Sequence, residues 1–512
     1  MNDQAFQLTA IAIYFAAMIG IGVYAARKNQ SHEDYMLAGR SLSPTTAALS
    51  AGASDMSGWL MMGLPGAIYA AGLIEAWIAI GLTIGAYLNW RFVAPRLRAY
   101  TEVAGNSITV PSFFENRLKD RTRLLRVVSS LVILVFFTFY ISSGMVAGGV
   151  FFESSFGVEY IWGMLLVAGV TLLYTLFGGF LGASLTDVVQ GLMMMGALVA
   201  IPVIATVTLG GPGNVVDAVN AVDPELFSLV GGGLTPVVLL AIVSAAAWGL
   251  GYAGQPHIIV RFMALRSVRA ATPARRVGMS WMILSLAGAV TSGFIGLAYI
   301  QRNALDLADP ETINLVMSQV LFHPLVAGFV LAAVLAAIMS TVSSQLIVCS
   351  SALVEDLYRV VTKRTPSQKT LALAGRLCVL AIAVIAGVMA IDQSGTILEL
   401  VGFAWAGFGA AFGPVILLAL FWRRLTNWGA LTGMVVGGVT VFVWPLFGTG
   451  LYEIVPGFAL NLIVAVVVSR FTWKPNEEID REFDEAARLV REKDDTTSGA
   501  QPSTPNSATR VA

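Results

Sequence analysis

One carboxylate, Asp55, lies in the middle of the stretch SAGASDMSGWLMMGLPG at residues 50–66, among small and apolar residues. Inside a bilayer an unpaired charge costs about 2.5 kcal/mol or more, so it needs a partner. The glycines and Pro65 allow a membrane helix to open near Asp55 and to free the carbonyls of Ala53 and Met56. Such oxygens are the ligands that small hard cations prefer. If this stretch crosses a membrane, it predicts a cation site.

A second group of oxygen atoms is expected from AAIMSTVSSQ at residues 336–345. A helical Ser or Thr side chain leans back toward the preceding turn, so Ser340 and Thr341 both approach the Ala337 carbonyl. Taken alone, these hydroxyls are more often helix-packing residues. Combined with Asp55 they predict an all-oxygen cage with one negative charge, which suits a monovalent hard cation, and sodium is the natural candidate.

A third stretch, AAAWGLGYAGQPH at residues 245–257, predicts another interrupted helix. Its helix breakers are Gly249, Gly251, Gly254 and Pro256. Trp248 and Tyr252 are four residues apart and share one face of a helix. Either aromatic residue alone would more often belong to a packed core, but here both lie beside freed backbone. We expect them to form two walls of a solute site.

The alternatives for these and other residues are structural. Asp55 could form an ion pair with a basic residue such as Arg40, although an acid within a membrane helix is a functional candidate by default. Cys349 and Cys378 lack the spacing of a metal site or a disulfide framework. The net charge of zero argues against a nucleic-acid partner.

The composition indicates an all-α polytopic membrane protein, because 56% of the 512 residues are hydrophobic, 12% are charged and the mean hydropathy is +0.76. Runs of about 20 apolar residues suffice to cross a bilayer. We predict thirteen spans, at residues 6–26, 44–73, 74–95, 127–152, 160–180, 187–209, 234–256, 277–300, 323–352, 371–391, 395–422, 428–447 and 453–472.

Lys and Arg residues gather in every second connection between these spans and near the adjoining span ends. Of the 31 Lys and Arg residues, only Arg302 lies in one of the other connections. Because Lys and Arg are retained in cytoplasmic loops, we expect the N-terminus outside and the C-terminus in the cytoplasm. Residues 1–9 carry no basic residue, which favours an uncleaved first span over a signal peptide. Residues 475–495 are predicted to form a charged surface helix.

The two expected breaks are five spans apart, so two five-helix units start from opposite sides of the membrane. Such an inverted repeat places its binding site at the paired broken helices. The expected division of the chain is a first helix and loop at 1–43, the two repeats at 44–209 and 210–422, two further helices at 423–473 and a polar cytoplasmic tail at 474–512.

These stretches, together with GGFLGASLTDVVQG at 178–191 and IMSTVSSQLIVCSSALVEDLY at 338–358, closely resemble the sodium/solute symporters, in particular their proline-transporting branch. The resemblance implies a LeuT-type inverted repeat of five plus five helices with flanking helices, and sodium-driven uptake of L-proline across the bacterial cytoplasmic (inner) membrane. It implies sodium contacts from Ala53, Asp55, Met56, Ala337, Ser340 and Thr341. It also implies proline contacts from Tyr140, Trp248 and Tyr252, with Ser57 and Gly58 shaping the site.

Three other readings remain open from the sequence. The same fold serves a sodium symporter for another small solute, such as a carboxylate or a sugar. It also serves a membrane sensor or a channel, but the polar tail is too short for a signalling domain, and a closed ion cage favours occlusion over continuous conduction. Nothing in the chain indicates an enzyme.

Overall fold

The computed structural model describes residues 2–27, 38–358, 368–392 and 395–497, and most of this part is helical. The described residues contain no β-strand, and their one isolated bridge joins Leu42 to Leu265. This all-α architecture follows from the bilayer, where each backbone polar group must find its partner within the segment.

The described residues up to Thr208 form eight α-helices, of which α8 and α9 are the longest. The α-helices are α1 (Asp3–Ala26), α3 (Pro44–Asp55), α4 (Leu64–Ala71), α5 (Ala76–Leu88), α6 (Ala94–Val103), α7 (Val110–Leu118), α8 (Leu124–Phe156) and α9 (Tyr160–Thr208). Short 3₁₀ or π turns connect several of them, namely η1 (Ala38–Arg40), η2 (Trp59–Gly63), η3 (Gly72–Glu75) and η4 (Asn89–Val93).

The second half of the chain also consists of α-helices joined by short turns. Its α-helices are α10 (Pro212–Val222), α11 (Pro236–Ala246), α12 (Pro256–Met263), α13 (Ala271–Arg302), α14 (Ile313–Leu321), α15 (Pro324–Ser351), α17 (Gln368–Met389), α18 (Ile397–Phe421), α19 (Asn427–Val443), α20 (Ile454–Thr472) and α21 (Glu477–Thr497). The short turns are η5 (Pro224–Phe227), η6 (Ala247–Gly254), η7 (Val268–Ala270), η8 (Pro310–Thr312), η9 (Ala352–Tyr358) and η10 (Trp444–Phe447).

The first expected break lies directly after Asp55. Ser43 caps the start of α3 by accepting from the amide of Thr46, and the helix ends where Met56 adopts φ −90° and ψ 83°. A π-helical turn, η2, follows before α4 resumes the run. The chain therefore leaves helical geometry inside an otherwise apolar span, as the glycines of this stretch predict.

The second expected break is the 3₁₀ segment η6, which separates α11 from α12. Gln255 ends it in an extended conformation, with φ −82° and ψ 106°, and Pro256 begins α12. Pro is favoured at the start of a helix, where its missing amide hydrogen costs nothing.

The long helix α9 contains one residue outside helical geometry, Gly179, with φ 58° and ψ −158°. Glycine adopts this conformation readily because it has no Cβ. The position lies at the end of the expected span 160–180, just before the expected span 187–209. Two crossings of about 20 residues each would fit within the 49 residues of α9.

Ten helical runs of the described chain are long and apolar enough to cross a membrane. Two of these runs are 45 and 49 residues long, at Trp59–Val103 and Tyr160–Thr208, and the shorter apolar helix Leu373–Met389 lies outside the ten. The fold class is confirmed as an all-helical membrane protein, whereas the count of thirteen spans stays a prediction.

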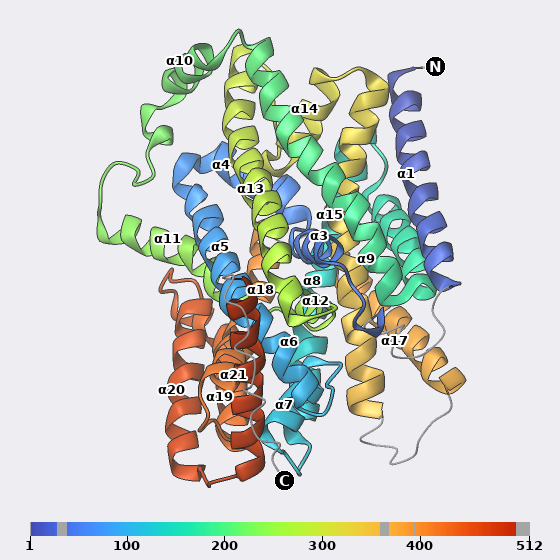
Figure 1. Ribbon diagram of the computed structural model, residues 1–512. Helices are drawn as coiled ribbons and strands as arrows, with labels where there is room; N and C mark the ends of the chain where they lie inside the picture. Colours follow the sequence, from blue (N-terminus) through green and yellow to red (C-terminus); the bar gives the residue numbers. More distant parts are fainter. Residues whose placement is uncertain (1, 28–37, 359–367, 393–394, 498–512) are drawn as a thin grey trace, which may run out of the picture.

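The interior of the bundle is formed around α3, α15 and α18 (Figure 1). In α15 and α18, 83% of the most apolar window is buried, against 33% for α1 at the edge of the molecule. Helix α3 packs against α13, α9, α12 and α15. The first helix break is therefore enclosed by protein.

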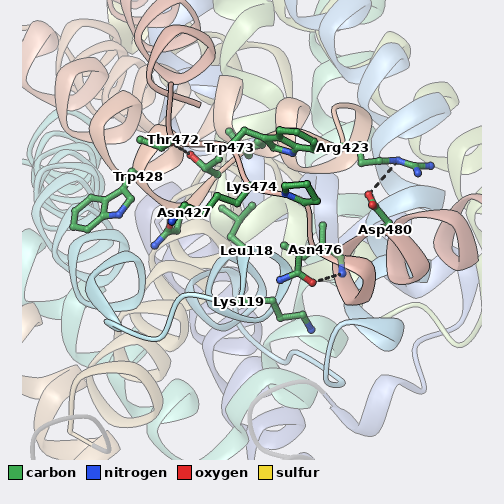
Figure 2. A pocket seen from close by; sticks show the side chains of 14 residues that line it. Leu118, Lys119, Arg423, Asn427, Trp428, Thr472, Trp473, Lys474, Asn476 and Asp480 are labelled. Atoms are coloured by element: carbon green, nitrogen blue, oxygen red, sulfur yellow. Dashed lines mark hydrogen bonds and ion pairs between the residues drawn. The ribbon is translucent and has the colours of Figure 1, made fainter. Parts of the chain in front are cut away.

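The tail helix α21 packs against α6. The ring of Phe483 faces the guanidinium groups of Arg96, Arg117 and Arg423, and Lys119 forms a 2.6 Å ion pair with Glu482. A cavity of about 450 Å³ lies beside it, between the ends of α7 and α20 and the starts of α19 and α21 (Figure 2). None of the residues expected to bind sodium or solute lines this cavity.

Candidate ion and solute site

The Asp55 side chain is fully buried at the end of α3. One carboxylate oxygen, Oδ2, accepts a very short hydrogen bond from the Tyr252 hydroxyl in η6. The other oxygen, Oδ1, has no hydrogen-bond partner among the residues that the structure describes. This side-chain contact joins the two helix breaks, and it leaves one buried anionic oxygen available for a further ligand.

The main chain of the first break is held by two aromatic side chains. The Asp55 carbonyl accepts from the Trp59 indole at 3.2 Å and from the Tyr140 hydroxyl at 3.3 Å. Tyr140 is buried in α8, so its bond ties the break to a continuous helix. These donors supply the hydrogen bonds that the interrupted helix no longer provides for this carbonyl.

The hydroxyls of α15 meet the same break from the other side. Ser340 Oγ donates to the Ala53 carbonyl at 2.7 Å and also lies 3.1 Å from the Ala337 carbonyl. Thr341 Oγ1 lies 3.5 Å from the Ala53 carbonyl. The structure thus brings together four of the oxygen atoms expected for sodium, from α3 and α15.

Two expected sodium ligands are not in direct contact with this cluster. The Asp55 carboxylate bonds Tyr252 instead of the hydroxyls of Ser340 and Thr341. Among the described residues, no hydrogen bond joins the Met56 carbonyl to the cluster. Both residues lie at the break itself, within three positions of Ala53.

The aromatic residues expected for solute binding form one connected group. Trp248 is buried and stacks on Trp405 and Tyr452, with ring centroids 6.0 and 5.8 Å apart. Its ring also lies 5.8 Å from that of Trp59, beside the first break. Tyr252 meets Trp405 edge to face at 5.7 Å. The expected walls are therefore adjacent to Asp55.

Ser57 and Gly58 complete the turn after Asp55. Ser57 is buried, and its hydroxyl lies 3.5 Å from the Trp59 amide. A Cβ on Gly58 would lie 3.0 Å from the Ala147 Cβ and 3.4 Å from Ile338, so glycine allows the break to approach α8 and α15 closely. Both residues lie directly after Asp55, and their role in shaping the site stays a prediction.

The ion-pair alternative for Asp55 is not what the structure contains. The Arg40 guanidinium donates to the carbonyls of Met263 at 2.8 Å and of Ser107 at 2.6 Å. Asp55 bonds Tyr252, with the other carboxylate oxygen unpaired.

Sequence reasoning missed three aromatic residues of the site, Trp59, Trp405 and Tyr452. Trp59 offered a weak signal, since it lies four residues beyond Asp55 in the same broken stretch. Trp405 offered none, because it lies in an apolar stretch where an aromatic residue is ordinary. Tyr452 offered none either, because it lies in the short connection between two expected spans.

A buried polar network next to the site was also not predicted. Arg261 of α12 donates to Asp187 of α9 at 3.2 Å and to Ser344 of α15 at 2.5 Å. It also donates to Ser50 of α3 at 3.1 Å, and Ser50 donates to Asp187 at 2.7 Å. The network connects α3 to three of the helices that pack against it, α9, α12 and α15, and a buried charge pair of this kind requires such partners.

In this site, two interrupted helices meet at a buried carboxylate. Comparison with known proteins identifies the family to which such a chain belongs. The model of the sodium:solute symporter family matches residues 35–437. This chain belongs to the sodium:solute symporter family. Its members in bacteria include relatives that it matches over most of their length.

Three curated relatives are similar to this chain. It is 54% identical over 470 residues to the high-affinity proline transporter PutP of Bacillus subtilis, covering 91% of this chain and 98% of the relative. It is 51% identical to the osmoregulated proline transporter OpuE of the same organism, covering 95% and 99%. It is 50% identical to a sodium/proline symporter of Staphylococcus aureus, covering 94% and 96%.

Solved structures with the same fold support the architecture. A Na⁺-coupled sialic acid symporter in a substrate-bound outward-open state matches with a TM-score of 0.78 at 19% identity, covering 92% of this chain and 98% of that one. Mhp1, a nucleobase-cation-symport-1 family transporter, matches with a TM-score of 0.54 at 16% identity, covering 89% and 99%. The fold is of the LeuT type, and the protein is a multi-pass membrane transporter, as its relatives are.

Proposed function

We propose that this protein is a sodium-coupled symporter that takes up L-proline by alternating access. The observation that supports the proposal is the bond between Tyr252 and Asp55, because it joins a residue expected to bind the solute to a residue expected to bind sodium. The names of the curated relatives, which are proline transporters and a sodium/proline symporter, support the choice of both cargoes.

Sodium fits the oxygen cluster chemically. The donors are carbonyl and hydroxyl oxygens, with one buried carboxylate oxygen that lacks a protein partner, and hard monovalent cations select such ligands. In our proposal the ligands are the carbonyls of Ala53, Met56 and Ala337, the hydroxyls of Ser340 and Thr341, and the carboxylate of Asp55. Sodium would replace the protein bonds that these groups make without it.

Proline fits the aromatic group for a different reason. It is a small zwitterion with a flat apolar ring, so it needs aromatic walls and a few polar groups for its charged ends. We assign the walls to Trp248, Tyr252 and Tyr140, with Ser57 and Gly58 at the edge nearest the ion. The Tyr252 hydroxyl would exchange Asp55 for a ligand when sodium arrives, so one residue senses both cargoes.

The ion gradient is large enough to drive accumulation. A cation that enters down a potential of ~100 mV and a tenfold gradient releases about 3.7 kcal/mol, which suffices for several-hundred-fold concentration of a solute at one-to-one coupling. We place the protein in the bacterial cytoplasmic membrane, with the N-terminus outside and the C-terminus in the cytoplasm. We also propose two inverted repeats at 44–209 and 210–422.

The experiment is uptake of radiolabelled proline into proteoliposomes that contain the purified protein. We expect accumulation when an inward sodium gradient is imposed, and none when potassium replaces sodium on both sides. Unlabelled carboxylates and sugars, added in excess, test the alternative that another small solute is carried. No proline uptake, together with sodium-driven uptake of a radiolabelled carboxylate or sugar, would assign the protein to that solute.

A further inference from the structure

Trp405 contacts two of the three proposed wall residues, Trp248 and Tyr252. It belongs to α18, is fully buried, and its ring stacks on Trp248 and meets Tyr252 edge to face. Trp405 has no solvent-accessible surface. It can therefore influence solute binding only through the residues that it contacts.

Two hydrogen bonds attach Trp405 to the ends of the 3₁₀ segment. Its indole nitrogen donates to the Trp248 carbonyl at 2.8 Å, near the start of η6. Its own carbonyl accepts from Gln255 Nε2 at 3.1 Å, just after η6 ends. A 3₁₀ helix of eight residues is longer than is usual and has poor internal hydrogen-bond geometry, so it depends on outside partners.

The backbone of η6 also lies flush against this residue. A Cβ on Gly251 would overlap the indole nitrogen of Trp405, and a Cβ on Gly254 would overlap the Phe408 carbonyl one turn along α18. Glycine is therefore required for the approach at Gly251. The separation of Trp248 from Tyr252 is consequently fixed by a template from a different helix.

We propose that Trp405 is a positioning residue that sets the spacing of the two aromatic walls, and thereby selects the ring size of the cyclic imino acid. This inference rests on the proposed function. Removing the indole N–H leaves the ring contacts in place but frees the Trp248 carbonyl, so the segment gains alternative conformations. The site then loses discrimination between rings of different size before it loses the ion.

The test compares Trp405→Phe, which removes the N–H and keeps an aromatic ring, with Gln255→Met, which removes the donor at the other end. Trp162→Phe is the control, because it makes the same substitution at a residue of α9 that is 63% exposed. Uptake is measured in proteoliposomes for proline, for the four-membered azetidine-2-carboxylate and for the six-membered pipecolate. The sodium concentration for half-maximal uptake is measured in the same preparations.

We expect Trp405→Phe to raise the KM for proline about fivefold, as the loss of one hydrogen bond predicts. The preference for proline over the two other rings should shrink by a similar factor, with half-maximal sodium within about twofold of the wild-type value. Gln255→Met should shift the same quantities in the same direction, and Trp162→Phe should shift none. Should Trp405→Phe fail to insert, Gln255→Met decides.

Wild-type KM and ring preference in both variants would overturn the inference. A lower transport rate with unchanged ring preference would also overturn it, since that is the signature of a merely structural role. Wild-type protein that takes up no proline contradicts the proposed function itself, and this is seen before any variant is compared.

Discussion

At the scale of single residues, Asp55 shows how the protein retains a charge within the bilayer. Its carboxylate is fully buried, bonds Tyr252 through one oxygen and leaves the other without a protein partner. An unsatisfied buried anionic oxygen is costly, so it marks a place where a ligand is expected. Sodium as a partner explains both the charge and its incomplete pairing.

The hydroxyls of α15 give the first prediction. Ser340→Ala and Thr341→Ala should each raise the sodium concentration for half-maximal uptake by about fivefold or more, because each removes one proposed oxygen ligand. Proline affinity should recover when sodium is raised. Ser350→Ala is the matched control, since Ser350 belongs to the same helix but bonds Gly375 of α17. A loss of proline affinity that saturating sodium leaves unchanged would move Ser340 into the solute site.

Glu311, outside the spans, gives a prediction for pH. Its carboxylate accepts from the amides of Ile397 and Leu398, which begin α18, at 2.8 and 3.0 Å. Burial raises the pKa of Glu311 from 4.5 to about 7, the two amides oppose this shift, and Asp309 and Glu399 add to it. The folded protein therefore binds a proton more tightly than the unfolded chain. This contribution to stability is complete below pH 4.5 and is lost as the pH rises through 7.

The measurement is the thermal unfolding midpoint in detergent between pH 5 and 8. We expect the midpoint of the wild type to fall relative to that of Glu311→Gln as the pH rises, because glutamine does not titrate. Parallel curves for the two proteins would contradict the assigned shift.

Much of the ion cluster could be predicted from residue types, and less of the solute site. Ala53, Ser340 and Thr341 come together as expected, because the two adjacent hydroxyls extend from the same turn of α15 toward the first break. The bond of Asp55 to Tyr252 was not foreseen, since it depends on how two broken helices cross. Trp405 was missed because an aromatic residue in an apolar helix gives no signal until its partner is known.

At the scale of elements, the proposed function depends on two membrane helices whose α-helical geometry is interrupted. Glycine and proline predicted both breaks correctly. The sequence did not predict that the second break is a continuous 3₁₀ segment, because that geometry depends on contacts with α18. Local composition thus locates a break, whereas tertiary contacts decide its conformation.

The close approach of η6 to α18 gives a prediction about stability. Gly251→Ala should lower the unfolding midpoint and abolish proline uptake, since the added methyl group would overlap the Trp405 ring, which cannot move within its buried site. The control is Gly169→Ala, where a methyl group would meet no atom within 4 Å. Fluorescence-detected thermal unfolding of both variants checks the difference. Equal midpoints would show that α18 and η6 are free to separate.

At the scale of the whole molecule, the distribution of Lys and Arg predicts the orientation. After both native cysteines are replaced by serine, a cysteine at Leu305 should react with a membrane-impermeant maleimide from outside intact cells. A cysteine at Lys474 should react only after the membrane is opened. Both positions are exposed, Leu305 at 41%. The reverse pattern, or equal labelling of both, would refute the thirteen-span orientation.

The fold class was predictable because the bilayer leaves few choices, and hydropathy alone excludes a soluble chain. The number of membrane crossings is harder to determine, both from the sequence and from the structure. Helix α9, for example, departs from helical geometry only at Gly179. The tail helix was expected from its charges, and α21 forms there. Its packing through Phe483 against three arginines was not foreseen, because it depends on loops that are distant in the sequence.

In our proposal, sodium at Asp55 and proline at the aromatic walls together stabilise one conformation. Each ligand must therefore increase the affinity for the other by the same factor. The measurement is equilibrium binding of radiolabelled proline to purified protein across a sodium series, with potassium keeping the ionic strength constant. In the wild type the Kd for proline should fall by about 5- to 150-fold as sodium rises, within the usual range of such coupling. In Asp55→Asn, which keeps the size but removes the charge, the Kd should stay at the sodium-free value throughout. Wild-type sodium dependence in Asp55→Asn, or a wild-type Kd that is the same with and without sodium, would contradict the account.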